Sequence, residues 1–217
     1  MTLRSCPRGP WSVQGASLVI GVWPAMEIHR IAPLPAGLSE LYNEIFDASG
    51  LHCRPQLAWI ADAGGRLGFY AHGLVALGAK DMTDLATNVW TKYLTHLSVH
   101  DAYWAQLSGE CVYTLSFEQV WWICVRLLLA HELGHARQAE CGDGRHGIAA
   151  ETDADDFAAR IAQVLGWDAS LDALVMHAIG CTSGTACGHP SPDGRVAVYR
   201  RAREAERRAQ LTVAHWR

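Results

Sequence analysis

The feature that most constrains this chain is the pentapeptide HELGH at residues 131–135, which follows a long apolar run. Positions four apart lie on one face of a helix, about one turn from each other. The imidazoles of His131 and His135 can therefore reach a single metal ion while Glu132 stands beside them. This spacing predicts a fold built around a helix that carries a metal site.

Residues 117–130 have the features of the helix that the motif requires. Ser116 can cap it, Glu118 suits the positive end of the helix dipole, and no Gly or Pro interrupts the run. The middle of the run is apolar nearly all the way round, which indicates a buried helix. With Arg126 inside it, the run is shorter than the roughly 20 apolar residues of a membrane span, so no membrane span is predicted.

The composition narrows the class of protein further. A chain of 217 residues, half of them apolar, is expected to form one domain with a substantial core. The net charge of −4 and the pI near 6.2 provide no general attraction to nucleic acid or to an anionic membrane. No nucleic-acid partner is therefore expected.

The cysteines indicate the redox compartment. Seven are scattered along the chain without a CxxC pair, which favours a reducing compartment and argues against a cysteine zinc knuckle. The expected localisation is cytoplasmic. Secretion is the alternative, because Arg4 and Arg8 precede an apolar stretch at residues 16–23, as in a signal peptide, although Pro10 interrupts the approach to it.

The role of the first residues stays open at this point. Residues 1–25 are assigned to an N-terminal extension and residues 26–217 to a single domain. The extension is a signal, a pro-segment, or a poorly ordered stretch ahead of a functional start at Met26. The sequence indicates no particular oligomeric state.

Two further segments have a helical pattern ahead of the motif. Residues 39–49 are expected to form a helix with Ser39 as its N-cap and Gly50 at its end, and with Leu41, Ile45 and Phe46 turned inward. Residues 82–97 are expected to form a second one. Its inward side would consist of Leu85, Val89, Trp90, Tyr93 and Leu97.

Short apolar runs predict the strands. Residues 56–62 and 67–71 flank a Gly-Gly pair and predict a β-hairpin. Residues 72–77 fit either a helix or a strand. Further along, residues 100–104 suggest a loop near the cleft, and residues 111–115 a strand that leads into the motif helix.

A catalytic zinc ion needs a third protein ligand and an open position for water. In one metallopeptidase class this ligand is the last His of HExxHxxGxxH, but Gln138 and Cys141 occupy the Gly and His positions here. Glu151 is the better candidate, on a second helix predicted after the turn at residues 142–144. Asp155 lies one turn further on the same face, where it is expected to accept the spare ring N–H of a ligating His.

Alternatives to this ligand set remain open. Glu151 and Asp155 can instead form a solvated acidic face at the start of a helix. If Glu151 is not the ligand, the next candidates are Asp155, His146 and Asp153. His96 and His100 also stand four apart, but with no acid between them and no third ligand they are not expected to bind a metal.

HELGH followed by ExxAD at residues 151–155 resembles the gluzincin metallopeptidases, in which two His and a downstream Glu bind zinc. The segment HPSPDGR at residues 189–195 is similar to the His-Pro…Arg segment of the heat-shock membrane and prenyl-protein peptidases of that class. The resemblance covers about residues 56–200. The chain departs from that group in its lack of predicted membrane spans and in a short spacer of 15 residues between HELGH and ExxAD. These departures indicate a soluble relative, similar to the phage-exclusion peptidases.

The resemblance implies a zinc metallopeptidase that acts on a protein or peptide. The implied fold is α+β, a mostly helical zincin-like catalytic domain with a small β-sheet or hairpin packed beside the HExxH helix. The implied zinc (Zn2+) ligands are His131, His135 and Glu151. Glu132 would be the general base that takes a proton from the metal-activated water.

The residues of the third element agree with a role at such a site. Ser191 can cap a helix that begins at Pro192, so the start of this helix is well specified. His189 lies just outside it and is expected to act in catalysis by donating a hydrogen bond to the oxyanion formed on attack. Arg195, one turn into the helix, is expected to orient Glu151 or the substrate.

Two other functions fit parts of the chain. One is a catalytically silent zincin-fold module that acts by partner binding, against which the intact HExxH motif argues. The other is nucleic-acid binding by the basic segment at residues 200–208. Glu204 and Glu206 interleave its arginines, however, which favours a solvated helix with internal ion pairs.

Overall fold

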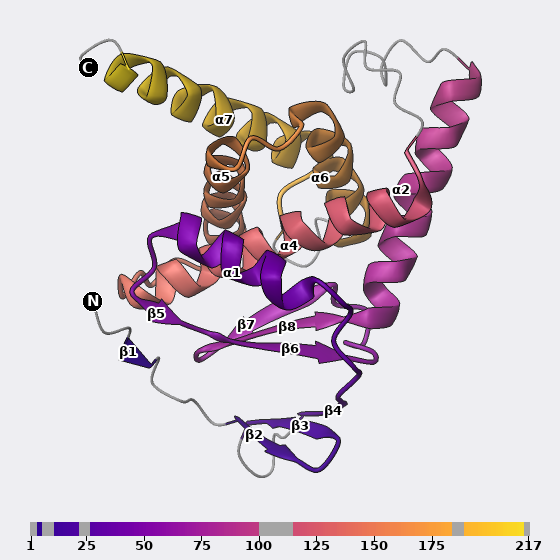
Figure 1. Ribbon diagram of the computed structural model, residues 1–217, viewed down its shortest axis with the longest axis vertical. Helices are drawn as coiled ribbons and strands as arrows, with labels where there is room; N and C mark the ends of the chain where they lie inside the picture. The colour runs from indigo at the N-terminus through magenta and orange to yellow at the C-terminus, as the bar shows by residue number, and fades with distance from the viewer. Residues whose placement is uncertain (1–3, 6–10, 22–26, 100–114, 184–188, 215–217) are drawn as a thin grey trace.

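The computed structural model describes residues 4–5, 11–21, 27–99, 115–183 and 189–214. Over these residues the chain has a mostly helical α+β fold, with helices on one face of a small sheet (Figure 1). The predicted loop at residues 100–104 and the predicted strand at 111–115, save its last residue, lie outside the described residues. The side chains of the His96 and His100 pair also lie outside them.

The central helix is α4 (Phe117–Glu140), which is the predicted motif helix and includes HELGH. Ser116 caps it as predicted. Its Oγ accepts the backbone N–H of Gln119 at 3.2 Å, and Gln119 Oε1 accepts the N–H of Ser116 at 2.7 Å, which completes a capping box. The apolar run ahead of HELGH is buried as predicted. Within the described ranges, no helix combines the length and apolar character needed to cross a membrane.

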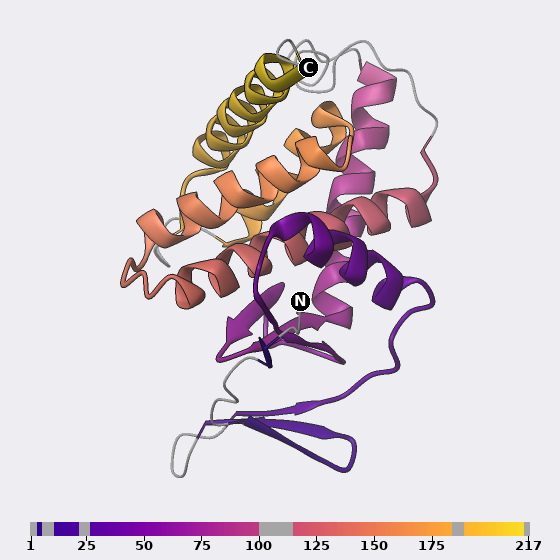
Figure 2. The same cartoon turned by 60° about the vertical axis from the view of Figure 1, so that its left-hand side comes forward.

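The other helices surround α4. Those in contact with it are α1 (Leu38–Ser49), α2 (Ala79–Val99), α5 (Ile148–Val164) and α6 (Ala169–Ser183). The last helix, α7 (Pro192–Ala214), packs on α5 and α6. Figure 2 shows α5 alongside α4, to which a short loop joins it. α7 begins at Pro192 as predicted, with Ser191 Oγ accepting the N–H of Gly194 at 3.1 Å.

The ends of α1 and α2 differ in part from the prediction. α1 begins one residue earlier than expected, with Gly37 and not Ser39 at its N-cap, and no side chain caps it. Its end at Gly50 is confirmed, because Gly50 has the left-handed conformation of a helix C-cap, with φ 67°. α2 extends the predicted helix at both ends, and Leu85, Val89 and Tyr93 are buried as expected.

The predicted hairpin between residues 56–62 and 67–71 is wrong. The strands β6 (Gln56–Ile60), β7 (Gly68–Ala71) and β8 (Leu74–Gly78) form a sheet in the order β6-β8-β7. β6 pairs in parallel with β8, and the hairpin joins β7 to β8 through His72 and Gly73. Both turn residues have positive φ, 43° and 84°, as in a type I′ turn. β8 is buried along its whole length, so it takes the central position, where both faces are covered.

A second sheet covers the far face of β6-β8-β7. Its strands β2 (Trp11–Gln14), β3 (Ser17–Ile20) and β4 (Glu27–Arg30) are antiparallel and lie below the first sheet in Figure 1. Leu18 of β3 is buried in a cluster with Ile60 and Leu74. β2 and β3 belong to the expected extension at residues 1–25, and β3 pairs with β4 of the domain. A further pair is β1 (Arg4–Ser5) with β5 (Cys53–Arg54).

A buried ionic network fastens α6 and α7 to α4. Asp172 of α6 is fully buried, and its carboxylate accepts a hydrogen bond from Arg126 of α4 at 2.6 Å. From α7 it accepts the Tyr199 hydroxyl at 2.6 Å and the Arg203 guanidinium at 3.1 Å. These donors offset part of the cost of burying the charge, and burial still raises the pKa of Asp172 above its usual value. The network thereby fixes the helix that carries Arg195.

Beyond this network, the basic segment at residues 200–208 forms ion pairs within α7. Glu204 accepts from Arg207 and from Arg208, each at 2.8 Å. All three side chains are well exposed to solvent. The prediction of a solvated helix with internal ion pairs is confirmed for these residues.

The helices α4 and α5 approach closely at Gly134 and Ala154. A Cβ on Gly134 would lie 2.7 Å from Ala154 Cα and 3.1 Å from its Cβ. Because these atoms belong to the helix itself, they cannot swing aside as the end of a long side chain can. Any larger residue at position 134 must push the two helices apart.

We therefore expect Gly134→Ala to lower the free energy of unfolding. Overpacking of this kind costs about 1–3 kcal/mol, which outweighs the roughly 1 kcal/mol by which Ala is the better helix former. Urea unfolding of the two proteins measures the difference. Gly144→Ala is the matched control, since a Cβ there meets no atom within 4 Å. Equal or greater stability of Gly134→Ala would show that the helices are free to separate.

Candidate metal centre

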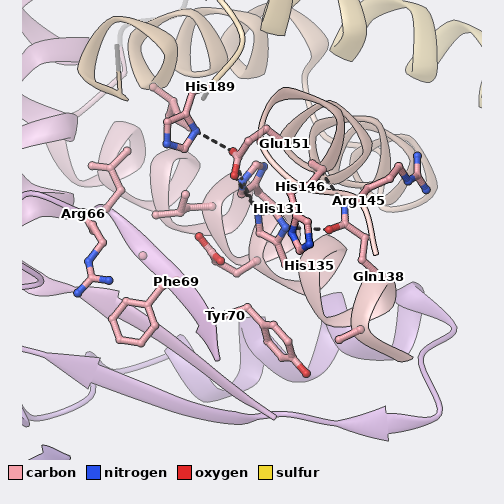
Figure 3. Close-up of a pocket in the computed structure, with 18 of the residues that line it drawn as sticks. Arg66, Phe69, Tyr70, His131, His135, Gln138, Arg145, His146, Glu151 and His189 are labelled. Atoms are coloured by element: carbon pink, nitrogen blue, oxygen red, sulfur yellow. Dashed lines mark hydrogen bonds and ion pairs between the residues drawn. The ribbon is translucent and has the colours of Figure 1, made fainter. Parts of the chain in front are cut away.

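The two motif histidines project from one face of α4 toward α5 (Figure 3). The Nε2 atoms of His131 and His135 lie 3.2 Å apart, and the ring planes are nearly perpendicular, at 89°. His131 is buried, and His135 is partly exposed to the pocket. The helical spacing of HELGH thus directs one nitrogen of each ring at a common point.

Glu151 joins the two histidines from α5. Its Oε2 lies 3.3 Å from His131 Nε2, and its Oε1 lies 3.4 Å from His135 Nε2. Among the described residues, His131, His135 and Glu151 are the group of side chains whose atoms are close enough to hold a metal ion. The other ligand candidates, Asp155, His146 and Asp153, are not part of this group.

Ligand atoms of the three residues lie at separations close to those around a tetrahedral zinc ion. Zinc–nitrogen and zinc–oxygen bonds of about 2.0–2.1 Å place tetrahedral ligands about 3.3–3.4 Å from each other. The two Nε2 atoms lie 3.2 Å apart, and each lies beside a different oxygen of the Glu151 carboxylate, His131 at 3.3 Å from Oε2 and His135 at 3.4 Å from Oε1. Two imidazoles and one carboxylate are also a ligand set of catalytic zinc sites that keep a fourth position for water. The residues therefore fit the ion in both chemistry and spacing.

Asp155 orients His131 by contacting Nδ1, the ring nitrogen that does not face Glu151. Its Oδ1 lies 2.9 Å from His131 Nδ1 and is fully buried. A carboxylate only accepts hydrogen bonds, so His131 donates from Nδ1 and turns Nε2 toward the common point. This is the contact predicted for Asp155, and the alternative of a solvated acidic face is wrong for this residue.

Arg195 and His189 reach the same carboxylates from α7 and the segment before it. Arg195 is buried, and it donates to Asp155 Oδ1 at 2.7 Å and to Glu151 Oε2 at 2.9 Å. Of its two predicted partners, Glu151 or the substrate, the structure pairs it with Glu151. His189 Nδ1 lies 3.0 Å from Glu151 Oε2, a contact that the sequence did not predict. Its proposed hydrogen bond to an oxyanion stays a prediction.

A cavity of about 900 Å³ opens beside the three ligands. One wall is β7 with the turn before it, residues 65–70, and another is the loop at residues 143–147 (Figure 3). Glu132 lines the cavity and is otherwise buried. A Cβ at Gly68 would lie 2.6 Å from Leu77 Cδ2, 3.0 Å from the carbonyl oxygen of Ala76 and 3.3 Å from Glu132 Oε1, so the glycine permits the close packing of β7 beside this carboxylate.

Burial and hydrogen bonds shift the proton affinities of the site in the metal-free protein. Burial alone lowers the pKa of His131, but its hydrogen bonds to Asp155 and Glu151 outweigh burial and raise it to about 10. Burial likewise raises the pKa of Glu151, yet hydrogen bonds from His131 and His135 hold it far below its usual range. Burial raises the pKa of Glu132. Without a metal ion, a proton on His131 therefore faces the Glu151 carboxylate.

Sequence reasoning missed two features of the site. One is the contact of Gly134 with Ala154, which brings the two ligand-bearing helices together. The other is Gln138, whose Oε1 lies 3.1 Å from His135 Nδ1. Its position one turn after His135 on the same helix face is the signal that could have revealed it.

Comparison with known proteins identifies no relative. No protein-family model matches the chain, and neither a curated protein nor a solved structure matches it. The interpretation of the site therefore depends on its geometry and chemistry.

The shifted pKa of His131 predicts that zinc binding releases a proton. Below pH 10 the metal-free residue is mostly protonated, and a bound ion would take the place of that proton. Apparent zinc affinity should rise about tenfold per pH unit between pH 6.5 and 8. The same proton stabilises the metal-free fold fully below pH 6.5, and this stabilisation is lost as the pH rises through about 10.

Calorimetric zinc titration in buffers of different ionisation enthalpy counts the protons. We expect at least one proton released per zinc ion at pH 7. Asp155→Asn removes the main hydrogen bond that raises the pKa of His131, so it should release fewer protons at pH 8. Zinc binding without proton release would contradict the assignment.

Proposed function

We propose that this protein is a zinc-dependent metallopeptidase of the gluzincin type, with a zincin-like catalytic domain. The observation that carries the proposal is the triangle of His131, His135 and Glu151 at the wall of an open cavity. Glu132, the residue next to the first of these ligands, lines the same cavity. A metal held only for structure would instead have its four positions filled by protein atoms.

A zinc ion bound there would supply a water of lowered pKa and polarise a substrate carbonyl. Glu132 would take the proton of the attacking water and return it to the amine that leaves. Burial raises the pKa of Glu132, so its carboxylate holds a proton more readily than an exposed one does. Arg195 would keep Glu151 in place, and His189, which lines the cavity, would donate to the oxygen of the attacked carbonyl.

The sheet supports a peptide as the substrate. Among the residues that the structure describes, β7 lies at one edge of the order β6-β8-β7 and pairs with β8 alone. Three of its residues, Gly68, Phe69 and Tyr70, line the cavity. An extended peptide can add to such an edge through backbone hydrogen bonds, with its carbonyl groups beside the metal ligands.

Glu132→Gln is expected to abolish peptide hydrolysis and to leave zinc bound. The amide has the size of the carboxylate but cannot accept the proton of the attacking water. Loss of a general base lowers the rate by about 10²–10⁴-fold. Cleavage of casein or of a peptide library, together with the zinc content of each protein, measures both effects.

Glu118→Gln is the matched control, because it makes the same change at an exposed residue of the same helix. It should cleave at the rate of the unchanged protein. Peptidase activity retained by Glu132→Gln would contradict its role as the base. A zinc-loaded protein that cleaves nothing would instead favour the catalytically silent, partner-binding module.

A further inference from the structure

Gln138 connects the two helices that carry the proposed metal ligands. It is buried in α4, one turn after His135, and its Oε1 lies 3.1 Å from His135 Nδ1. Its Nε2 lies 2.7 Å from the carbonyl oxygen of Ala150 and 3.2 Å from Asp153 Oδ2, both in α5. One side-chain amide thus contacts a ligand on α4 and the residue just before the ligand Glu151.

These contacts fix which way round the amide lies. A carbonyl oxygen and a carboxylate can only accept hydrogen bonds, so the end of Gln138 that faces Ala150 and Asp153 must be the NH2 group. The reversed amide would place its oxygen against two acceptors and its NH2 group against the ring of His135. Only the first orientation satisfies every partner.

The orientation of the amide in turn fixes the tautomer of His135. Because Oε1 of Gln138 can only accept, Nδ1 of His135 must carry the proton. Nε2 of a neutral ring then has a free lone pair, and this is the nitrogen that lies 3.2 Å from His131 Nε2 and 3.4 Å from Glu151 Oε1. The Asp155 carboxylate likewise holds the proton of His131 on Nδ1.

We propose that Gln138 is a positioning residue that holds the proton of His135 on Nδ1 and directs Nε2 to the metal. The inference rests on the metal centre of the proposed function but not on the reaction. The neutral amide performs for His135 what the Asp155 carboxylate performs for His131. It also ties the start of α5, and hence Glu151, to the ring that it orients.

Two variants distinguish the positioning of the His135 ring from a purely structural bond between α4 and α5. Gln138→Met keeps the size of the side chain and removes every hydrogen bond. Gln138→Glu keeps an acceptor for His135 Nδ1 but cannot donate to Ala150 or Asp153, and it places a carboxylate oxygen beside the acceptor atoms of both. We expect zinc affinity to fall about 10–100-fold in Gln138→Met and to be partly restored in Gln138→Glu. Competition with a chromophoric chelator measures the affinity of each protein for zinc.

Gln163→Met is the matched control, because Gln163 lies near the end of α5, twelve residues after Glu151, and bonds to Arg203. Its zinc affinity should equal that of the unchanged protein. Unchanged affinity in Gln138→Met would overturn the proposal. Equal losses in Gln138→Met and Gln138→Glu would also overturn it, because the bridge to Ala150 would then account for the whole effect.

A measurement on the unchanged protein tests the tautomer directly, whatever the folding of the variants. Nitrogen-15 chemical shifts of the imidazoles in the zinc-loaded protein distinguish a protonated Nδ1 from a metal-bound nitrogen. For His135 we expect a proton on Nδ1 and zinc on Nε2. Coordination through Nδ1 would overturn the proposal. Neither experiment requires peptidase activity, so a failure of the proposed function would leave this result standing.

Discussion

The close contact of Gly134 with Ala154 is the constraint on which the candidate site depends. His131 lies three residues before Gly134, and His135 directly follows it. On the other helix, Glu151 lies three residues before Ala154. All three ligands therefore lie within one helical turn of the contact point. Because neither residue adds bulk there, the backbones approach closely enough for a glutamate of α5 to reach two histidines of α4.

Buried charges and hydrogen bonds hold the ligand side chains that this packing brings together. Asp155 is fully buried beside a ligating ring, and Arg195 is buried beside Asp155 and Glu151. Each buried charge has a partner of opposite sign, as the cost of removing it from water requires. Arg195 belongs to α7, which Asp172 fastens to the core from α6. The site therefore depends on side chains from three helices and on a network that holds the third one in place.

Much of the site could be predicted from the sequence, because its residues lie on helices with clear starts and a clear period. Ser116 and Ser191 cap α4 and α7 as expected, and the spacing of HELGH and of Glu151 with Asp155 places each set on one face.

The sheet could not be predicted as well. Two apolar runs around a glycine pair favour a local hairpin, whereas β8 enters between them because its whole length is apolar. Pairing of distant strands leaves no such local mark. The contacts of Gln138 were not predicted either, because a polar residue near the end of a helix has the same pattern as a residue exposed to solvent.

The most direct test of the central claim is X-ray absorption at the zinc edge of the purified protein supplied with one equivalent of zinc. We expect a bound ion with nitrogen and oxygen neighbours at about 2.0–2.1 Å, two of which show the outer-shell scattering of imidazole rings. Zinc that stays free in solution would contradict the account. A site with sulfur neighbours at about 2.3 Å would contradict it as well.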